Sequence, residues 1–153
     1  MQLIRTPVYP RSRGFTLLEV LVAMVVLSVG LLGLSGLQTS SLRNNHSAFM
    51  RSQATLAAND IFDRMRANRA VAVAGSYNIS YAGSPGTVSC TTGCTAGDVA
   101  AMDVAEWRSY VERLPGGEGE IAVDAAGAAE VRVRWADARD SANKLEVITR
   151  SQI

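Results

Sequence analysis

Histidine and cysteine, the side chains that most often bind transition metals, are scarce in this sequence. The only histidine is His46, and the only cysteines are Cys90 and Cys94. A structural zinc site needs about four such ligands, and a thioredoxin-type redox pair needs two residues between its cysteines and a helix start. Three residues separate Cys90 from Cys94. We therefore expect neither a metal nor another cofactor, and we expect His46 to be a surface residue.

The sequence also lacks the residue constellations of an enzyme site. It has no nucleophile–base pair, no metal cluster and no glycine-rich phosphate loop. Asp103 and Glu106 next to Trp107 form an acid pair, but a glycosidase needs two carboxylates that face each other across a substrate cleft. No substrate-binding aromatics accompany the pair, so we expect it to lie on a solvated helix face. The sequence therefore predicts a protein without catalytic activity.

Charge is absent from a long stretch near the N-terminus. No charged residue occurs from Val20 to Leu42, and the Leu, Val, Ala and Met content of this run favours membrane insertion. Its length suits a helix that crosses a hydrocarbon core of roughly 30 Å. Arg5, Arg11 and Arg13 precede the run without any acidic neighbour. Because cytoplasmic flanks are rich in Lys and Arg, we expect a cytoplasmic N-terminus and a C-terminal part across the membrane.

Two interpretations of this N-terminal segment are compatible with its residues. A secretory signal peptide would place small residues after the apolar core for cleavage, and "GLSGLQTSS" supplies them. The basic head, with Gly14 directly before Phe15, instead favours a cut on the cytoplasmic side. In that case residues 1–14 are a leader, and the apolar helix stays on the mature protein.

The stretch "RGFTLLEVLVAMVVLSVGLLGL" resembles the class III leader and N-terminal helix of type IV pilins and pseudopilins. The resemblance covers the leader and the first helix, and every position of the short motif is matched. It implies that a prepilin peptidase cuts between Gly14 and Phe15 and methylates the new amine of Phe15. It also implies a role in assembly for Glu19, the fifth residue after the cut.

The physical chemistry of Glu19 agrees with a role in assembly. An ionised carboxylate in the hydrocarbon layer costs on the order of 3 kcal/mol on insertion scales, so such a residue usually has a partner or a function. Glu19 lies about 6 Å along a helix from Phe15, where the cationic terminal amine of a shifted neighbouring helix can meet it. Pairing removes the cost of two isolated charges. The alternative is a glutamate that extends to the lipid headgroups at the membrane face.

Three glycines occur at regular spacing in the apolar helix. Gly30, Gly33 and Gly36 recur every three residues. They either soften the helix, since glycine costs roughly 1 kcal/mol relative to alanine, or permit close helix packing in lipid. Many pilins carry a proline in this part of the helix, and this chain has none, so we do not predict a kink.

An apolar stripe continues the helix beyond the membrane segment. Its members recur at spacings of four and three residues: Met50, Ala54, Ala57, Ile61 and Met65. This spacing is typical of one face of an amphipathic helix, which we expect to pack against the C-terminal domain and to end near Gly75. A coiled-coil partner for the stripe is the alternative.

The middle of the chain is a loop region that contains both cysteines. Its abundant Gly, Ser, Pro and Thr residues favour turns, and in a domain exported to an oxidising compartment we expect a disulfide between Cys90 and Cys94. A second helix follows, with Asp98 as a candidate N-cap, a possible capping box of Thr95 with Asp98, and a stop at "LPGG". Its apolar side consists of Val104, Trp107, Val111 and Leu114.

Strands close the chain. "GEIAVDA" and "AEVRVRWADA" flank a short turn and predict an antiparallel hairpin, and "KLEVITRSQI" predicts a third strand. Alternation directs Val131, Val133, Trp135, Leu145 and Val147 inward. A candidate basic patch consists of Arg132, Arg134, Arg139 and Arg150. After a cut at Gly14, twelve basic and fourteen acidic side chains remain, a net charge of −2, so we do not expect nucleic acid as a partner.

These patterns predict an α+β fold, in which a long N-terminal helix, transmembrane and then amphipathic, packs on a small antiparallel β-sheet. The expected organisation is a leader (1–14), a transmembrane helix half (15–42), an amphipathic helix half (43–74) and a periplasmic globular domain (75–153).

The C-terminal part carries a second, looser resemblance. A short cysteine loop, then Asp103, Glu106 and Trp107, and then "LPGG" before a strand hairpin are similar to PilV-type minor pilins, the type IV pilus modification proteins. This resemblance implies a low-abundance subunit that joins other minor pilins in a complex priming pilus assembly at the tip. Cell adhesion and twitching motility are the processes that such a pilus serves.

The implied partners are other minor pilins, the major pilin, prepilin peptidase and the inner-membrane assembly platform, with membrane lipid before assembly. The implied location is a single pass of the inner membrane, followed by the pilus at the cell surface. Two alternatives stay open. A minor pseudopilin of type II secretion shares the leader and helix, and an uncleaved single-pass anchor would present a binding domain.

Overall fold

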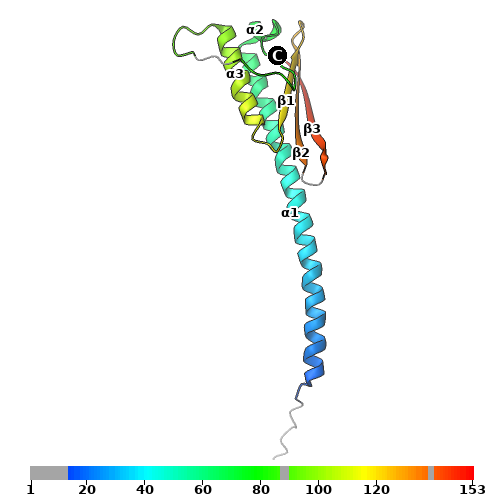
Figure 1. The fold of residues 1–153 in the computed structure, drawn as a ribbon. Coiled ribbons are helices and arrows are strands. Elements are labelled where there is room, and N and C mark those ends of the chain that lie inside the picture. The colour runs from blue at the N-terminus through cyan, green and yellow to red at the C-terminus, as the bar shows by residue number, and fades with distance from the viewer. Residues whose placement is uncertain (1–13, 87–89, 138–139) are drawn as a thin grey trace, which may run out of the picture. The chain divides into compact units, whose positions relative to one another are not determined.

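The computed structural model describes residues 14–86, 90–137 and 140–153. A long N-terminal helix and a small antiparallel sheet confirm the predicted α+β class. Residues 1–13 of the expected leader lie outside the described residues, as does Arg139 of the candidate basic patch. The elements in chain order are α1 (Leu17–Ala67), α2 (Arg69–Val73), α3 (Ala96–Val111), β1 (Glu118–Val123), β2 (Ala128–Asp137) and β3 (Asp140–Gln152) (Figure 1).

Helix α1 contributes to two compact units, which adjoin in sequence at Ser41 and Leu42. In the first unit, every described residue is exposed. Among the described residues, α1 is the one helix that is long and apolar enough to cross a membrane, judged by length and composition. An apolar helix surface of this size that its own chain does not cover is suited to lipid or to neighbouring helices.

The part of α1 that belongs to the second unit is amphipathic, as predicted. Ala54, Ala57, Ile61 and Met65 are buried, and Met50 packs against the core at intermediate burial. The stripe therefore faces the interior of its own chain.

The helical pattern ends near Gly75 in two steps. Helix α1 stops at Ala67, and the short α2 continues to Val73. Gly75 then adopts a φ of 87°, a left-handed conformation that glycine reaches without a steric penalty. This turn sends the chain into the loop that precedes α3.

Helix α3 begins with a capping box. The Thr95 hydroxyl oxygen accepts a hydrogen bond from the Asp98 amide at 3.1 Å, and the Asp98 carboxylate accepts one from the Thr95 amide at 2.9 Å. The predicted box is confirmed, whereas the prediction of Asp98 as the N-cap is wrong. Thr95 has the extended backbone of an N-cap residue, and Asp98 already lies in the first turn. The predicted apolar side is buried: Val104, Trp107, Val111 and Leu114.

Two glycines after α3 are required by the backbone. The "LPGG" stop places Gly116 at a φ of 58°, which lets the chain reverse toward β1. Gly119 faces Trp107 so closely that a Cβ atom there would lie 2.4 Å from the indole Cη2. The indole thus occupies the space that a side chain at position 119 would need.

The sheet has the order β1-β2-β3, and both strand pairs are antiparallel. Val131, Val133 and Trp135 are buried, as the alternation predicted. Strand β3 begins at Asp140, four residues before the predicted strand. The strand is longer because Asp140 still pairs with Asp137 of β2, after an irregularity of the register between Ala136 and Asp137. The polar residues at its start conceal this extension from a hydrophobicity pattern.

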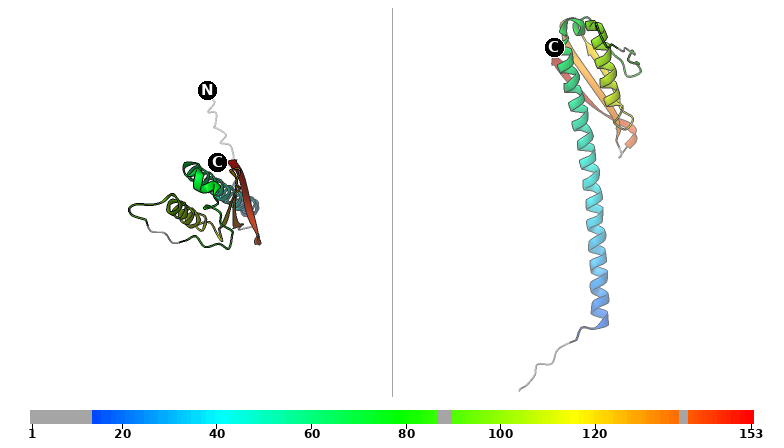
Figure 2. Two further views of the ribbon diagram at one scale, coloured as in Figure 1. Left: turned by 90° about the horizontal axis from the view of Figure 1, so that it is seen from above. Right: turned by 90° about the vertical axis from the view of Figure 1, so that its left-hand side faces the viewer.

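The core lies between the sheet and the helices of the second unit. Seen from above, α3 and the last turns of α1 lie on the same face of the sheet (Figure 2). Trp107 of α3 donates a hydrogen bond from its indole Nε1 to the Ala57 carbonyl oxygen of α1 at 3.0 Å. Trp107 and Trp135 are the two largest fully buried side chains, so they anchor α3 and β2 in one core.

Candidate assembly site

The N-terminal end of α1 places the predicted processing residues in an exposed position. Gly14 and Phe15 precede the helix, and Phe15 is 83% exposed. Thr16 caps the helix, since its hydroxyl oxygen accepts a hydrogen bond from the Glu19 amide at 3.2 Å. This cap was not predicted, although "TLLE" has the spacing of a capping box.

Glu19 is an exposed carboxylate in an otherwise apolar groove. The groove is lined by Phe15, Glu19, Val20, Ala23, Met24 and Leu27. Glu19 forms no ion pair with another described residue. A carboxylate in such a setting can accept a cation supplied by a second molecule, because an opposite charge offsets the cost of removing it from water. Cleavage after Gly14, methylation of Phe15 and pairing of Glu19 stay predictions.

The three glycines of the apolar helix do not pack against any other described part of the chain. A Cβ atom built on Gly30, Gly33 or Gly36 meets no atom within 4 Å. If close packing explains their spacing, the neighbour must therefore be another molecule.

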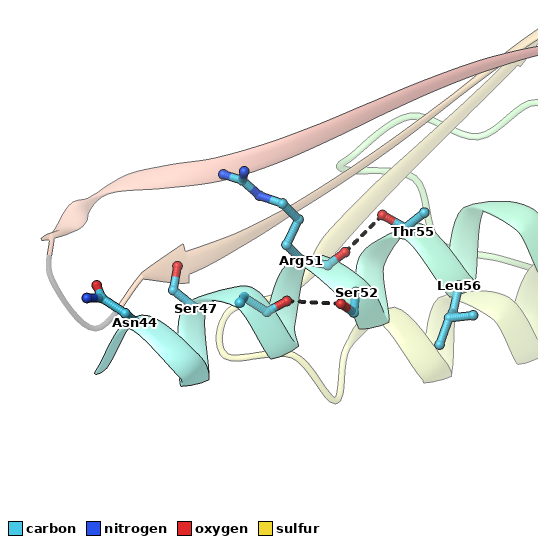
Figure 3. A pocket seen from close by; sticks show the side chains of 7 residues that line it. Asn44, Ser47, Arg51, Ser52, Thr55 and Leu56 are labelled. Atoms are coloured by element: carbon cyan, nitrogen blue, oxygen red, sulfur yellow. Dashed lines mark hydrogen bonds between the residues drawn. The ribbon is translucent and has the colours of Figure 1, made fainter. Parts of the chain in front are cut away.

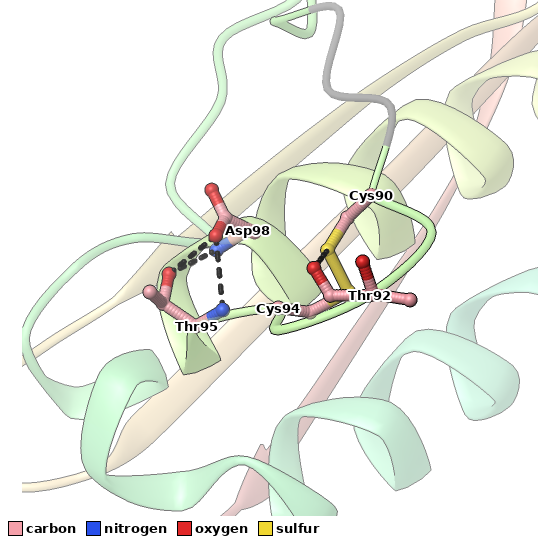
Figure 4. Close-up of a disulfide and its surroundings, with 5 residues drawn as sticks. All are labelled: Cys90, Thr92, Cys94, Thr95 and Asp98. Atoms are coloured by element: carbon pink, nitrogen blue, oxygen red, sulfur yellow. Dashed lines mark hydrogen bonds between the residues drawn. A yellow bond between two sulfur atoms is a disulfide. The ribbon is translucent and has the colours of Figure 1, made fainter.

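A disulfide joins Cys90 to Cys94, as predicted, with the Cα atoms 5.7 Å apart. It closes a short turn directly before the Thr95 cap of α3 (Figure 4). The crosslink restricts the loop at the point where it enters the helix.

Glu106 is exposed, as predicted, whereas the prediction is wrong for Asp103, which is largely covered. The Arg64 guanidinium of α1 donates from Nη1 to Asp103 Oδ1 at 3.1 Å and to Glu106 Oε2 at 2.7 Å. The Tyr77 hydroxyl donates to Asp103 Oδ2 at 2.7 Å, and the Asp103 side chain is only 16% exposed. The acid pair therefore joins α3 to α1.

The network moves the pKa values of Arg64, Glu106 and Tyr77 away from neutral pH. The hydrogen bond to Glu106, opposed by burial, raises the pKa of Arg64, and the same bond lowers the pKa of Glu106. Burial, reinforced by the bond to Asp103, raises the pKa of Tyr77 to about 12. These groups hold fixed charge states at neutral pH, as a structural network requires.

The candidate basic patch is neutralised where it is described. Arg132 and Arg150 both pair with Glu130, and Arg134 pairs with Glu118. The bond from Lys144, ahead of that from Arg134, lowers the pKa of Glu118. The described arginines on the outer face of the sheet are therefore paired with glutamates. Phosphate binding needs uncompensated positive charge, so this face is not suited to it.

A further groove runs along α1 in the second unit (Figure 3). The Ser52 hydroxyl donates to the Ala48 carbonyl oxygen at 3.1 Å, and the Thr55 hydroxyl donates to the Arg51 carbonyl oxygen at 3.0 Å. These hydroxyls thus return their hydrogen bonds to their own helix. The lining is Asn44, Ser47, Ala48, Arg51, Ser52, Thr55 and Leu56.

His46 is exposed on α1, as predicted. No group of three or more His, Cys, Asp or Glu residues suited to a metal occurs in the part of the chain that the structure describes.

Comparison with protein families agrees with the fold and the N-terminal segment. Residues 9–35 match the model described as "Prokaryotic N-terminal methylation motif", and residues 36–105 match the model described as "Type IV pilin Tt1218". The chain is therefore similar to type IV pilins over residues 36–105 and matches the prepilin N-methylation motif at its N-terminal end. No curated protein and no solved structure matches the chain.

The similarity to this family bears on the predicted function. The type IV pilin family is a structural protein family and not an enzyme family, which agrees with the predicted absence of catalytic activity. Both matches support a membrane-anchored pilin that prepilin peptidase processes and that becomes part of a pilus together with other pilus components. The PilV-type subclass, the membrane orientation and the individual partners are finer statements that these matches do not give.

Proposed function

We propose that this chain is a minor pilin that joins a minor-pilin complex, and that this complex primes assembly of a type IV pilus at its tip. The single observation that carries the proposal is Glu19, a carboxylate exposed in the apolar groove four residues beyond Phe15. Such a charge is unfavourable in a lone membrane anchor and is useful in a helix that assembles with others.

The proposed processing follows from the same segment. Prepilin peptidase cuts between Gly14 and Phe15 and methylates the amine of Phe15. Before assembly the N-terminus is cytoplasmic, the apolar half of α1 crosses the inner membrane, and the second unit lies in the periplasm. Three arginines in the leader support this orientation through the positive-inside rule.

Glu19 then meets the terminal amine of a neighbouring subunit's helix during transfer from the membrane to the filament. Burial of apolar helix faces supplies most of the association free energy. The ion pair chiefly sets the register, since only one axial offset between two helices brings the charges together.

Assignment as a minor pilin rather than the major one is supported by the similarity of the α3 region to PilV-type proteins. Asp103, Glu106 and Trp107, which carry that similarity, all join α3 to α1. The residues that carry the similarity therefore hold α3 against α1 in this chain.

The test is a clean deletion in the native host, with sheared surface pili and secreted exoproteins quantified side by side and a complemented strain as control. The proposal predicts loss of pili with normal secretion. Normal pili with lost secretion would contradict it and would identify a minor pseudopilin of type II secretion. If neither changed, an uncleaved membrane anchor would replace the proposal.

A further inference from the structure

The two edges of the sheet differ in how far their backbone groups are bonded by other described parts of the chain. Edge strand β1 presents the backbone groups of Gly119, Ile121 and Val123 on the side away from β2. The Ile121 amide donates to the Ile79 carbonyl oxygen at 2.9 Å, and the Ile79 amide donates back at 3.0 Å. Ile121, the middle residue of this edge, is therefore already paired with Ile79 through backbone hydrogen bonds.

Side chains complete the cover on either side of that bridge. The Asn78 amide nitrogen donates to the Val123 carbonyl oxygen at 3.3 Å, and the Asn78 Oδ1 atom accepts from the Val123 amide at 2.7 Å. The Arg108 guanidinium donates to the Gly119 carbonyl oxygen at 2.9 Å. The outer edge of β1 is thus occupied and cannot accept a further strand.

The register determines which residues of β3 face the opposite edge. Gly119 pairs with Val133, and Val133 pairs with Val147. Residue pairs in an antiparallel sheet alternate between hydrogen-bonded and non-hydrogen-bonded. Because Gly119 directs its backbone groups away from β2, Val133 directs its own toward Val147. Every second residue of β3 counted from Val147 therefore bonds to β2.

The residues in between direct their N–H and C=O groups to the free side of β3. The backbone bond from the Ile153 amide to the Gly127 carbonyl oxygen, at 3.0 Å, continues the same alternation at the end of the strand. No described segment forms a backbone hydrogen bond with this free side between positions 144 and 150. We call this set the β3 edge: Lys144, Glu146, Ile148 and Arg150.

We propose that the β3 edge receives an extended segment of a different polypeptide as the fourth strand of the sheet. The chemistry of that segment follows from the side chains beside it. Ile148 is 43% exposed among charged neighbours, which suits an apolar residue opposite. Arg150 is 70% exposed and shares Glu130 with Arg132, so it can also pair with an acidic residue of the incoming strand.

Lys144 repeats this arrangement at the other end of the edge, because it shares Glu118 with Arg134. The incoming segment therefore carries acidic residues opposite Lys144 and Arg150 and an apolar residue opposite Ile148. Charged side chains on an edge strand discourage unspecific pairing, and here they select a segment of complementary charge.

A second copy of this chain is a poor occupant for two reasons. Two copies cannot continue one sheet by joining β3 to β1, because the outer edge of β1 is occupied. Two β3 strands can pair about a two-fold axis, but β3 runs in the same general direction as the part of α1 beside it (Figures 1 and 2). The two-fold axis would make the chain enter the second unit at Leu42 from opposite ends of the dimer, which two subunits anchored in one membrane cannot achieve.

The test uses the full-length protein in its native host, with a photocrosslinking amino acid in place of Glu146, the residue of the β3 edge to which no residue of the incoming segment is assigned. Peptide mapping of the crosslinks, in membranes and in sheared pili, compares Ile148→Pro with Ile148→Ala. Both variants replace the isoleucine side chain with a smaller one, but only proline removes the outward N–H, a change that an edge strand tolerates. We expect a crosslink to one extended segment of another polypeptide, retained in Ile148→Ala and reduced about tenfold or more in Ile148→Pro.

Thermal unfolding of the purified variants shows whether Ile148→Pro keeps the fold. If it does not, the charge-reversed variant Arg150→Glu replaces it, and the expected result is a several-fold lower crosslink yield. Equal yields in the folded variant and in Ile148→Ala would overturn the proposal, as would crosslinks to this chain's own β3 or no crosslink at all.

The inference rests on the proposed membrane anchoring only where it excludes two-fold pairing. Intact mass of the same samples reports processing at Gly14 independently. A subunit that is processed and present in pili but has no crosslink at the β3 edge would refute this inference and leave the proposed function standing.

Discussion

Replacement of Arg108 by methionine is expected to destabilise the second unit without touching the membrane helix. Arg108 is only 4% exposed, and its guanidinium donates to three backbone carbonyl oxygens. The distances are 2.9 Å to Gly119, 2.8 Å to Ser80 and 2.7 Å to Gly83. One side chain therefore fastens β1 and the loop after α2 to α3.

The magnitude follows from what each carbonyl does after the change. Gly119 is buried, so its oxygen stays without a donor, at a cost of about 2 kcal/mol. Ser80 is exposed and Gly83 partly so, so water can replace the lost donor and each contributes about 0.5–1 kcal/mol. We expect Arg108→Met to lower the free energy of unfolding by about 3 kcal/mol, or the Tm by roughly 10–20 °C.

Urea unfolding of the full-length protein in non-ionic detergent measures this change through the fluorescence of the buried tryptophans. The matched control is Arg113→Met, just after α3, where the guanidinium lies 5.8 Å from the Tyr110 ring centroid and the residue is exposed. We expect the control to change the free energy of unfolding by less than about 1 kcal/mol. If Arg108→Met were as mild as the control, the three hydrogen bonds would not stabilise the unit and the reasoning would be refuted.

Three further predictions concern other parts of the chain. Glu19→Ala should leave membrane insertion intact but strongly reduce recovery in sheared pili, whereas Ser28→Ala, whose hydroxyl bonds only to its own helix, should assemble normally; equal recovery would remove the pairing role. Gly119→Ala should lower the free energy of unfolding by about 1–3 kcal/mol, because its Cβ would overlap Trp107; a neutral result in urea unfolding would contradict the close packing. The raised pKa of Tyr77 means that the folded chain keeps a proton between pH 10 and about 12 that the unfolded chain loses, so stability should fall as pH rises through this window. In Tyr77→Phe that decline should be shallower, and an unchanged slope would show that another group causes it.

Local sequence patterns predicted the elements of this fold well. The spacing of Met50, Ala54 and Ile61 identified the buried face of α1, and the alternation around Val133 and Trp135 identified the buried face of β2. Both patterns work because a regular backbone repeats its solvent exposure with a fixed period. Most of the fold class could therefore be predicted from the chain alone.

The errors lie where two candidates compete locally or where contacts cross long distances in sequence. Thr95 and Asp98 are both good capping residues within one turn, and only the backbone of Thr95 decides between them. The contact of Arg64 with Asp103 and Glu106 spans about forty residues, so no local period indicates it. The exposure of Asp103 was therefore overestimated, whereas that of Glu106 was predicted correctly.

One part of the candidate interaction surfaces could be predicted from the sequence, and another part could not. The resemblance to pilins pointed to Gly14, Phe15 and Glu19 from a short motif alone. The occupied edge of β1 and the free edge of β3 depend instead on strand register and on side chains from distant segments, such as Asn78 and Arg108. A partner surface of this kind is visible only once the sheet has been assembled.

The most direct test of the central claim is the intact mass of this chain recovered from sheared pili of the native host. The account predicts a subunit that begins at Phe15 and carries one added methyl group. A chain that retains residues 1–14, or that is found in membranes but never in the pilus fraction of a piliated strain, would contradict it.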